Sequence, residues 1–229
     1  MLVSIHQPEF IGYLGYYAKI LQADCHIVLD DVQFIKRGFI QRNNIYCNQL
    51  AKLITVPVKT KGLYLQQIND VEIDTSFDWR KKILGTLQFC YFKSPNFKRV
   101  FPLISKLINQ DWYKIVDLNL AWLKFILDIL SEDKPLYLAS NLKVIGIKSK
   151  RLCNLVQAID GDAYLSGVGA KAYNDESVFA ECNIKLQYVK FTHPVYMQMG
   201  RKFIKNLCIL DAIFNCNINE IKAWLKNDI

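Results

Sequence analysis

The chain has 229 residues, of which 52% are hydrophobic and 22% are charged, so it can bury a core and is not intrinsically disordered. The formal net charge of +8 fits an anionic partner, such as a nucleotide, a sugar phosphate, a nucleic acid or a membrane surface. Scattered, solvated lysines explain the same balance equally well, because the basic residues form no single run.

The composition also bears on compartment and metal content. The first residues have neither the basic region nor the cleavage site of a secretory signal. The seven cysteines include no CxxC pair, which argues against a zinc site and predicts reduced core thiols. The apolar stretch 115–130 is interrupted by charged residues, so it predicts a buried helix and no membrane span. We therefore expect a cytoplasmic protein.

The first 30 residues predict a βαβ unit with a parallel pair of strands. Residues 2–6 and 26–29 are apolar strand-like runs, and residues 13–23 between them have helical periodicity. The first strand should end at Gln7, because the following proline disfavours helical backbone there.

The middle of the chain has a different texture. Short β-rich runs at 44–47 and 53–58, with alternation at 71–73, predict an antiparallel hairpin. Helices are expected at 78–92, where Asp78 caps the first turn, and then at 97–109 and 112–131. We interpret residues 44–132 as a β-hairpin plus helical subdomain inserted into one α/β domain of residues 1–229.

Strands and helices alternate again in the last third of the chain, which favours a parallel sheet. The predicted fold class is α/β: a mainly parallel, Rossmann-like sheet built from βαβ units, with the inserted hairpin and helical segment. The expected strands are 136–139, 164–166 and 185–191, and the expected helices are 149–159, 176–182, 203–214 and 219–226.

Polar residues follow several predicted strands, and ligands of open parallel sheets bind at the carboxyl ends of strands. His6 is a candidate general base or hydrogen-bond donor to a phosphate oxygen, or else a histidine that only fixes the turn. Asp30 and Asp31 are candidate catalytic carboxylates that orient a hydroxyl or hold a divalent metal; an ordinary turn is the alternative. The other strand-end candidates are Gln7, Ser166, Gly167, Gly169, Lys171 and His193.

A basic loop follows the second strand. Its arginines suit phosphate or carboxylate, and its aromatic residues Phe34 and Phe39 can stack on a base. A solvated basic loop is the alternative. The candidate substrate-binding residues here are Gln33, Lys36, Arg37, Gln41, Arg42 and Asn43.

Short segments in order along nearly the whole chain resemble the WbqC-like family. They include IHQPEF (5–10), LDDVQF (29–34), KRG (36–38), QRN (41–43), TVPVK (55–59), LSG (165–167) and FTHPVY (191–196). The last segment adds Tyr196 as a candidate binding residue. Val168 and Met197 depart from the family pattern, which has proline at both positions. The resemblance implies a role in bacterial surface-polysaccharide, O-antigen and lipopolysaccharide biosynthesis, and hence nucleotide-sugar chemistry.

A weaker resemblance concerns the start of the fold. A strand, a proline and then Gly15 opening a helix look like the beginning of nucleotidylyltransferases and pantothenate synthetase, which bind ATP through two histidines. Tyr13 and Tyr16 occupy the histidine positions here. Tyrosine can hydrogen-bond a phosphate but carries no positive charge, so adenylyl transfer is not established and the use of ATP stays open.

Three functions are compatible with these features. The first is a transferase or ligase that N-acylates or aminoacylates a nucleotide-linked amino sugar, with the nucleotide sugar or another phosphorylated small molecule as partner. The second is a nonenzymatic nucleotide-sugar-binding or assembly protein. The third is an aminoacyl-tRNA-dependent transferase, prompted by the net charge, although no RNA-binding signature supports tRNA as a partner. No covalent cofactor and no structural metal are expected.

Overall fold

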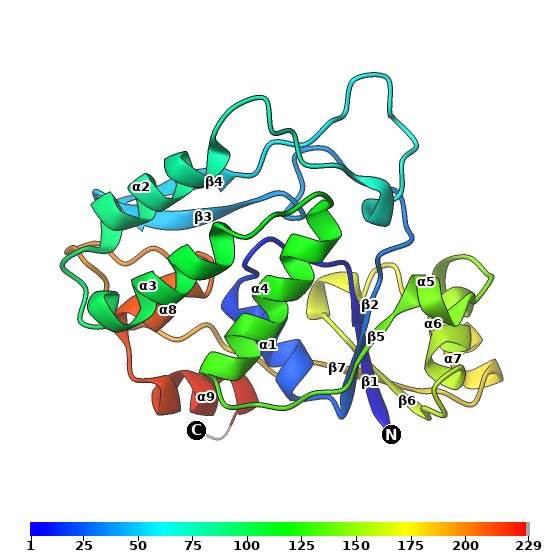
Figure 1. Ribbon diagram of the computed structural model, residues 1–229. Coiled ribbons are helices and arrows are strands. Elements are labelled where there is room, and N and C mark those ends of the chain that lie inside the picture. Colours follow the sequence, from blue (N-terminus) through cyan, green and yellow to red (C-terminus); the bar gives the residue numbers. More distant parts are fainter. Residues whose placement is uncertain (228–229) are drawn as a thin grey trace.

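The computed structural model of the protein describes residues 1–227 and contains a five-stranded sheet in which all paired strands are parallel. The strand order is β5-β2-β1-β6-β7, so the first strand lies at the centre (Figure 1). The predicted α/β class with a mainly parallel sheet is confirmed. The strands are β1 (Leu2–His6), β2 (Cys25–Val28), β5 (Leu136–Leu138), β6 (Ala163–Ser166) and β7 (Lys185–Tyr188).

The central strand β1 is apolar because protein covers both of its faces. Val3, Ser4 and Ile5 are buried, and His6 at the end of the strand lies opposite Val28 of β2. Parallel strands of this kind are continuous apolar runs, so residues 2–6 are recognisable from the sequence. Since β1 also pairs with β6, its carboxyl end lies between two neighbouring strand ends.

Helices cover both faces of the sheet. α6 and α7 pack on β6 and β7, and α5 follows β5, on the face that lies to the right in Figure 1. On the other face α1 packs against the C-terminal helix α9. These helices are α1 (Leu14–Leu21), α5 (Ala139–Leu142), α6 (Lys148–Gln157), α7 (Glu176–Glu181) and α9 (Ile218–Lys226).

Between β2 and β5 the chain forms the expected antiparallel hairpin and three helices. Asp78 caps the first of these helices by accepting a hydrogen bond from the Lys81 N–H, as predicted. The role of residues 44–132 as an inserted subdomain stays a prediction. The elements are β3 (Arg42–Cys47), β4 (Leu50–Thr55), a short 3₁₀ helix η1 (Ile68–Asp70), α2 (Trp79–Tyr91), α3 (Phe97–Ile108) and α4 (Ile115–Ile129).

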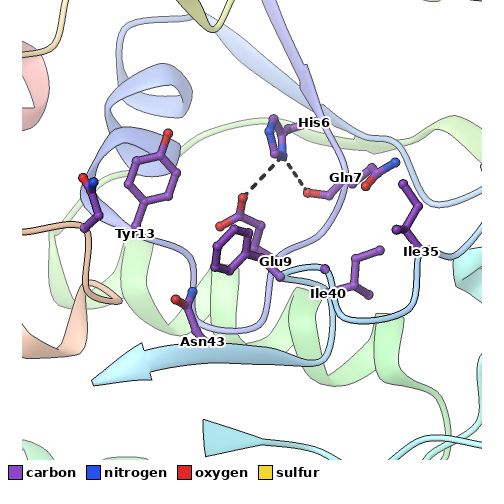
Figure 2. A pocket seen from close by; sticks show the side chains of 10 residues that line it. His6, Gln7, Glu9, Tyr13, Ile35, Ile40 and Asn43 are labelled. Atoms are coloured by element: carbon purple, nitrogen blue, oxygen red, sulfur yellow. Dashed lines mark hydrogen bonds and ion pairs between the residues drawn. The ribbon is translucent and has the colours of Figure 1, made fainter. Parts of the chain in front are cut away.

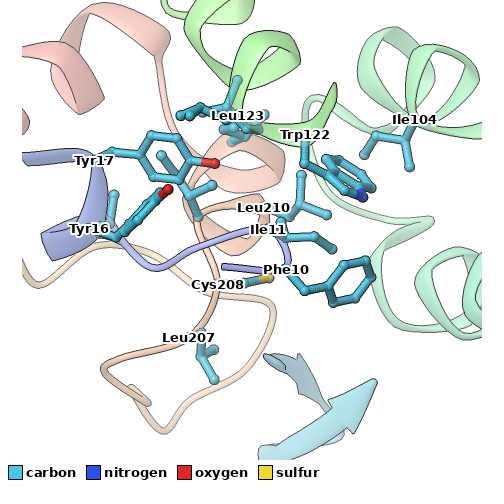
Figure 3. Packing of buried hydrophobic residues seen from close by; sticks show 14 of the residues in the cluster. Phe10, Ile11, Tyr16, Tyr17, Ile104, Trp122, Leu123, Leu207, Cys208 and Leu210 are labelled. Carbon is cyan, nitrogen blue, oxygen red and sulfur yellow. The ribbon is translucent and has the colours of Figure 1, made fainter. Parts of the chain in front are cut away.

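The larger of two hydrophobic clusters joins these helices to the first βα connection. Trp122 of α4 is fully buried and meets Phe10 edge to face, with the ring centroids 6.2 Å apart. Figure 3 shows Ile11 and Leu210 beside them. The segment after β1 is therefore anchored to α4, and this anchoring fixes the backbone that follows His6.

The predicted helix at 203–214 is wrong in its first half. Only α8 (Leu210–Asn215) is helical. The buried Gln198 side chain accepts a hydrogen bond from the N–H of Ile204 and donates one to its carbonyl, and Asn206 has a positive φ of 61°. These side-chain bonds take up backbone groups that a helix would have paired. β7 is also shorter than predicted, since it ends at Tyr188.

Two further expectations concern the cysteines and the apolar stretch 115–130. All seven cysteines are free thiols. Within residues 1–227, no helix has the length and hydropathy needed to cross a membrane, and the apolar stretch 115–130 is the largely buried helix α4.

Candidate active site

The candidate active site lies at the carboxyl end of β1, where the chain order of the sheet reverses. The chain passes from β1 to β2 and β5 on one side and adds β6 and β7 on the other. A crevice forms at such a switch point in open α/β sheets and commonly holds the ligand. Two cavities open here, of about 580 Å³ and about 110 Å³, and both are lined by His6 and Tyr13.

The larger cavity lies between the segment after β1 and the loop before β3. Figure 2 shows the Glu9 carboxylate pointing toward His6, with Tyr13 on one side of them and Ile40 on the other. The wall is mostly apolar with a few converging polar groups, which is the usual character of a small-molecule site. The full lining is His6, Gln7, Glu9, Tyr13, Ile35, Gly38, Phe39, Ile40, Asn43 and Asn206.

A buried asparagine ties the two walls of this cavity together. Asn119, on the inner face of α4, donates hydrogen bonds to the carbonyls of Pro8 (3.1 Å) and Ile40 (2.8 Å). Asn43 adds a bond to the carbonyl of Phe10 at 3.2 Å. Irregular backbone can be buried here because side chains satisfy its carbonyl groups. Asn119 is therefore a positioning residue for the site.

His6 presents a neutral imidazole to both cavities. Its Nδ1 lies 3.0 Å from the carbonyl oxygen of Gln7, which can only accept, so Nδ1 carries the proton and Nε2 is left as an acceptor. The surrounding protein and then the Lys19 ammonium lower the pKa of His6, although 38% of its side chain stays exposed through the cavities. A neutral histidine with a free Nε2 is suited to accept a proton.

Glu9 and Lys19 are two buried ionisable groups near His6, and each shifts the pKa of the other. Glu9 lies 4.0 Å from His6 Nδ1, and its second oxygen is buried without a hydrogen-bond partner. Burial raises the pKa of Glu9 to about 7, against the opposing effect of Lys19. Burial lowers the pKa of Lys19 to about 7, against the effect of Glu9. Both groups can therefore exchange protons near neutral pH, as catalytic acids and bases do.

This pair predicts a pH-dependent effect of Glu9→Gln on stability. The folded-state pKa of Glu9 lies above the ordinary value of 4.5, so its contribution to stability is present at low pH and is lost as the pH rises through about 7. Between pH 5 and pH 7, Glu9→Gln should gain about 1–3 kcal/mol relative to the wild type in urea unfolding. Exposed Glu181→Gln is the control and should change with pH like the wild type. A constant difference between Glu9→Gln and the wild type would contradict the buried carboxyl.

Sequence reasoning did not select Glu9 or Lys19 as site residues. Lys19 is the only charged residue between Phe10 and Gln22, and all residues of α1 are buried. A lone lysine in an otherwise uncharged, apolar helix is costly to bury, so its presence there is the sequence feature that could have indicated a functional role. Its Nζ donates to the carbonyl of Ile5 at 2.8 Å and faces the smaller cavity.

The smaller cavity lies against the first turn of α1. Gly15 and Tyr16 belong to this turn, and the Tyr13 ring lies so close to Gly15 that a Cβ there would come within 2.5 Å of it. Free backbone N–H groups at a helix start favour anions, and Lys19 below them adds positive charge. Gly167 and Gly169 line the opposite side, whereas Ser166 is buried and accepts from Asn174.

The two aspartates after β2 are engaged elsewhere. Asp30 accepts from the backbone N–H of Ser140 at 3.0 Å and from its hydroxyl at 2.6 Å. Asp31 pairs with Arg151 at 2.5 Å. Among the described residues, no hydrogen bond or ion pair joins either aspartate to His6. Asp30 thus links the end of β2 to the start of α5, and its catalytic role stays a prediction.

The basic loop borders the larger cavity through its apolar side chains. Ile35 and Phe39 line the cavity, but Lys36, Arg37 and Arg42 are not among its lining residues. Lys36 lies over the Tyr64 ring at 5.2 Å, and Arg42 donates to the carbonyl of Arg37.

The glutamines of this loop and Lys171 differ in how far they are buried. Gln33 binds the Tyr64 carbonyl, and Gln41 is buried with an unpartnered side-chain oxygen. Lys171 is exposed over the Tyr188 ring.

His193 and Tyr196 lie on the loop after β7. His193 accepts from the N–H of Asn206, which lines the larger cavity, so this histidine supports one edge of the site. Tyr196 donates to the buried Asp211 at 2.9 Å. Neither residue is among those that line the two His6 cavities.

Comparison with known proteins gives one family and one relative. The model of the WbqC-like protein family matches residues 7–223. An uncharacterized protein of Mycobacterium tuberculosis (strain ATCC 25618 / H37Rv), Rv1507c, is 31% identical over 215 residues, which cover 93% of each chain. No solved structure gives a significant match. The matched region includes Glu9, Lys19 and every residue that lines the two cavities except His6, which directly precedes it.

Proposed function

Because this chain belongs to the WbqC-like protein family, we propose that it is a transferase acting on a nucleotide-linked amino sugar in bacterial surface-polysaccharide biosynthesis, such as that of O-antigen. The observation that carries the proposal is the neutral His6 beside the buried Glu9–Lys19 pair, at the mouth of a cavity on the switch point of the sheet. The reaction would take place in the cytoplasm, where nucleotide sugars are substrates.

The two cavities suit the two chemical parts of such a substrate. The smaller one, with the start of α1 and Lys19, suits a phosphate group. The larger one, with Phe39 and Ile40 on its wall, suits the flat or apolar parts. His6 and Tyr13 line both, so the reacting group would lie between them.

The residues between the two cavities can supply the proton acceptor and the proton donor that N-acylation needs. The substrate amine attacks the carbonyl carbon of an activated acyl donor, a C–N bond forms, and the bond from the acyl carbon to its leaving group breaks. His6 Nε2 accepts the proton that the amine loses. Protonated Glu9 or Lys19 returns a proton to the leaving group, since each has a pKa of about 7 and exchanges its proton near neutral pH.

Binding of uridine diphosphate, measured by calorimetry, tests the phosphate subsite. Lys19→Met should weaken it by about 10–100-fold, the equivalent of a charge-assisted hydrogen bond of about 1.5–3 kcal/mol. Lys98→Met, on the exposed face of α3, is the matched control and should bind like the wild type. Equal affinity of Lys19→Met and wild type would remove the anion subsite.

The same measurement separates the basic loop from the helix start. Arg37 and Arg42 remain predicted anion ligands, and loss of one charged contact should cost about tenfold or more in affinity. Unchanged affinity in Arg37→Ala and Arg42→Ala, with a loss in Lys19→Met, would assign the phosphate to α1 alone.

A further inference from the structure

Four loops at the carboxyl end of the sheet form one continuous surface, which we call the carboxyl-edge rim. It comprises residues 32–41, 59–67, 143–151 and 167–174. Gln33 donates to the Tyr64 carbonyl, which joins the first two loops. A cavity of about 920 Å³ is lined by Val32, Ile147 and Tyr173, so it connects the first loop to the third and fourth.

The rim exposes an unusual share of large apolar side chains. It contributes nine of the twenty exposed large hydrophobic residues in the described chain. Four of them are more than three-quarters exposed: Ile145 (86%), Tyr173 (83%), Leu65 (82%) and Ile147 (76%). Isolated exposed apolar residues are ordinary, but a group around a cavity mouth marks an interaction surface. The nine are Ile35, Phe39, Leu63, Tyr64, Leu65, Ile145, Ile147, Val168 and Tyr173.

The same four loops carry cations and contain no aspartate or glutamate. Lys59 pairs with Glu72, and Arg151 pairs with Asp31. The other cations of the rim have no ion pair within the part of the chain that the structure describes. The nine cations are Lys36, Arg37, Lys59, Lys61, Lys143, Lys148, Lys150, Arg151 and Lys171.

We propose that the carboxyl-edge rim docks on an anionic lipid surface. Basic side chains interleaved with exposed apolar ones bind the boundary between phospholipid headgroups and acyl chains, each type of residue adding to the affinity. The Ile35 and Phe39 side chains belong both to the rim and to the wall of the His6 cavity, so docking brings the mouth of that cavity to the headgroups.

The composition of the rim favours lipid over the other anionic or apolar partners. Most of its apolar residues are aliphatic, and aliphatic side chains gain little from nucleic acid, whose bases stack on flat rings. A second copy of the chain would bring together two sets of the rim cations that have no ion pair in the described chain, and these cations repel. An anionic bilayer neutralises the cations and buries the aliphatic side chains at once.

Co-sedimentation of the full chain with vesicles tests the proposal. Vesicles in which about one-third of the lipid is anionic phosphatidylglycerol and the rest is phosphatidylcholine should bind the protein. Pure phosphatidylcholine vesicles should bind it far less. Binding should fall as salt is raised. Equal binding to both vesicle types, or none to the anionic ones, would overturn the proposal.

Two variants separate the apolar and the charged contributions. Leu65→Ser/Ile145→Ser/Ile147→Ser should lower binding by about tenfold for each aliphatic residue removed. Lys61→Gln/Lys143→Gln/Lys148→Gln should lower it by about fivefold for each cation. All six side chains are exposed, although Ile147 and Lys148 also line the 920 Å³ cavity, so folding should be retained, as circular dichroism would verify.

The matched control is Leu50→Ser/Leu53→Ser/Leu103→Ser, which removes exposed leucines from the hairpin and α3. It should bind vesicles like the wild type, and a loss as large as that of the rim variant would overturn the assignment to the rim. If the wild type binds tRNA but no vesicles, and the serine variant of the rim still binds tRNA, the rim would be assigned to RNA instead. Self-association lost in the serine variant would assign it to a second copy.

This test is independent of the proposed transferase activity. None of the six substituted residues lines either His6 cavity. Uridine diphosphate should therefore bind to the variants as it does to the wild type, whether or not vesicles are present.

Discussion

His6→Gln is expected to lower turnover by about 10²–10⁴-fold, the usual contribution of a general acid or base. Glutamine keeps a hydrogen-bonding side chain but cannot take up a proton near neutral pH. The affinity for uridine diphosphate should change little, because Lys19 and the start of α1 stay in place. The measurement is the initial rate of acetyl transfer from acetyl-coenzyme A to UDP-glucosamine, followed by mass spectrometry.

The pH profile of the same reaction gives a second readout. The pKa of His6 is lowered, so its base form persists at and below neutral pH and should give no acidic limb there. Turnover that survives in His6→Gln with an unaltered pH profile would show that His6 is not the proton acceptor. Glu9 and Lys19 would then be the leading candidates, and a wholly inactive wild type with intact ligand binding would favour the nonenzymatic alternative.

Asp211→Ala is expected to destabilise the fold by about 4 kcal/mol or more, the largest structural effect that we predict. The carboxylate of Asp211 is fully buried and accepts hydrogen bonds from Tyr91 (2.9 Å), Tyr196 (2.9 Å) and Gln198 (2.7 Å). Removal of the acceptor leaves three donors without a partner, each costing about 1–3 kcal/mol when buried. Burial raises the pKa of Asp211, and the three hydrogen bonds oppose that shift.

Urea unfolding at pH 7 measures this effect. Asp175→Ala, which removes an exposed cap of α7, is the control and should cost about 1 kcal/mol. A loss in Asp211→Ala no larger than that of the control would contradict the network. The network holds the loop 189–209 against α2 and α8, and Asn206 of this loop lines the His6 cavity.

The strands of the sheet were accessible to sequence reasoning because burial on both faces leaves a plain apolar run. The predicted strand 2–6 matches β1, and the bounds of the predicted strand 26–29 are shifted by one residue from those of β2. The loop 203–209 was not accessible in this way. Its apolar residues have helical spacing, but the side chain of Gln198, five residues before the segment, pairs its backbone. Such side-chain bonds from outside the segment override its local periodicity.

The composition of the site was only partly predictable. The rule on strand ends leads to His6 and Gln7, which line the cavity, and equally to Asp30, whose carboxylate is turned to Ser140. Which of several consecutive polar side chains faces a cavity depends on the backbone after the strand, where no periodicity applies. The local sequence gives a signal for Lys19, a lone lysine in an apolar helix, but none for Glu9, whose burial depends on packing between segments far apart in the chain.

The central claim is that the ligand site lies at the carboxyl end of β1, against the start of α1. A difference electron-density map from crystals soaked with UDP-N-acetylglucosamine tests it most directly. We expect the diphosphate within hydrogen-bonding distance of the Gly15 N–H and Lys19 Nζ, and the sugar beside His6. Density confined to the cavity lined by Lys148 and Arg151, with the His6 cavities empty, would contradict the account.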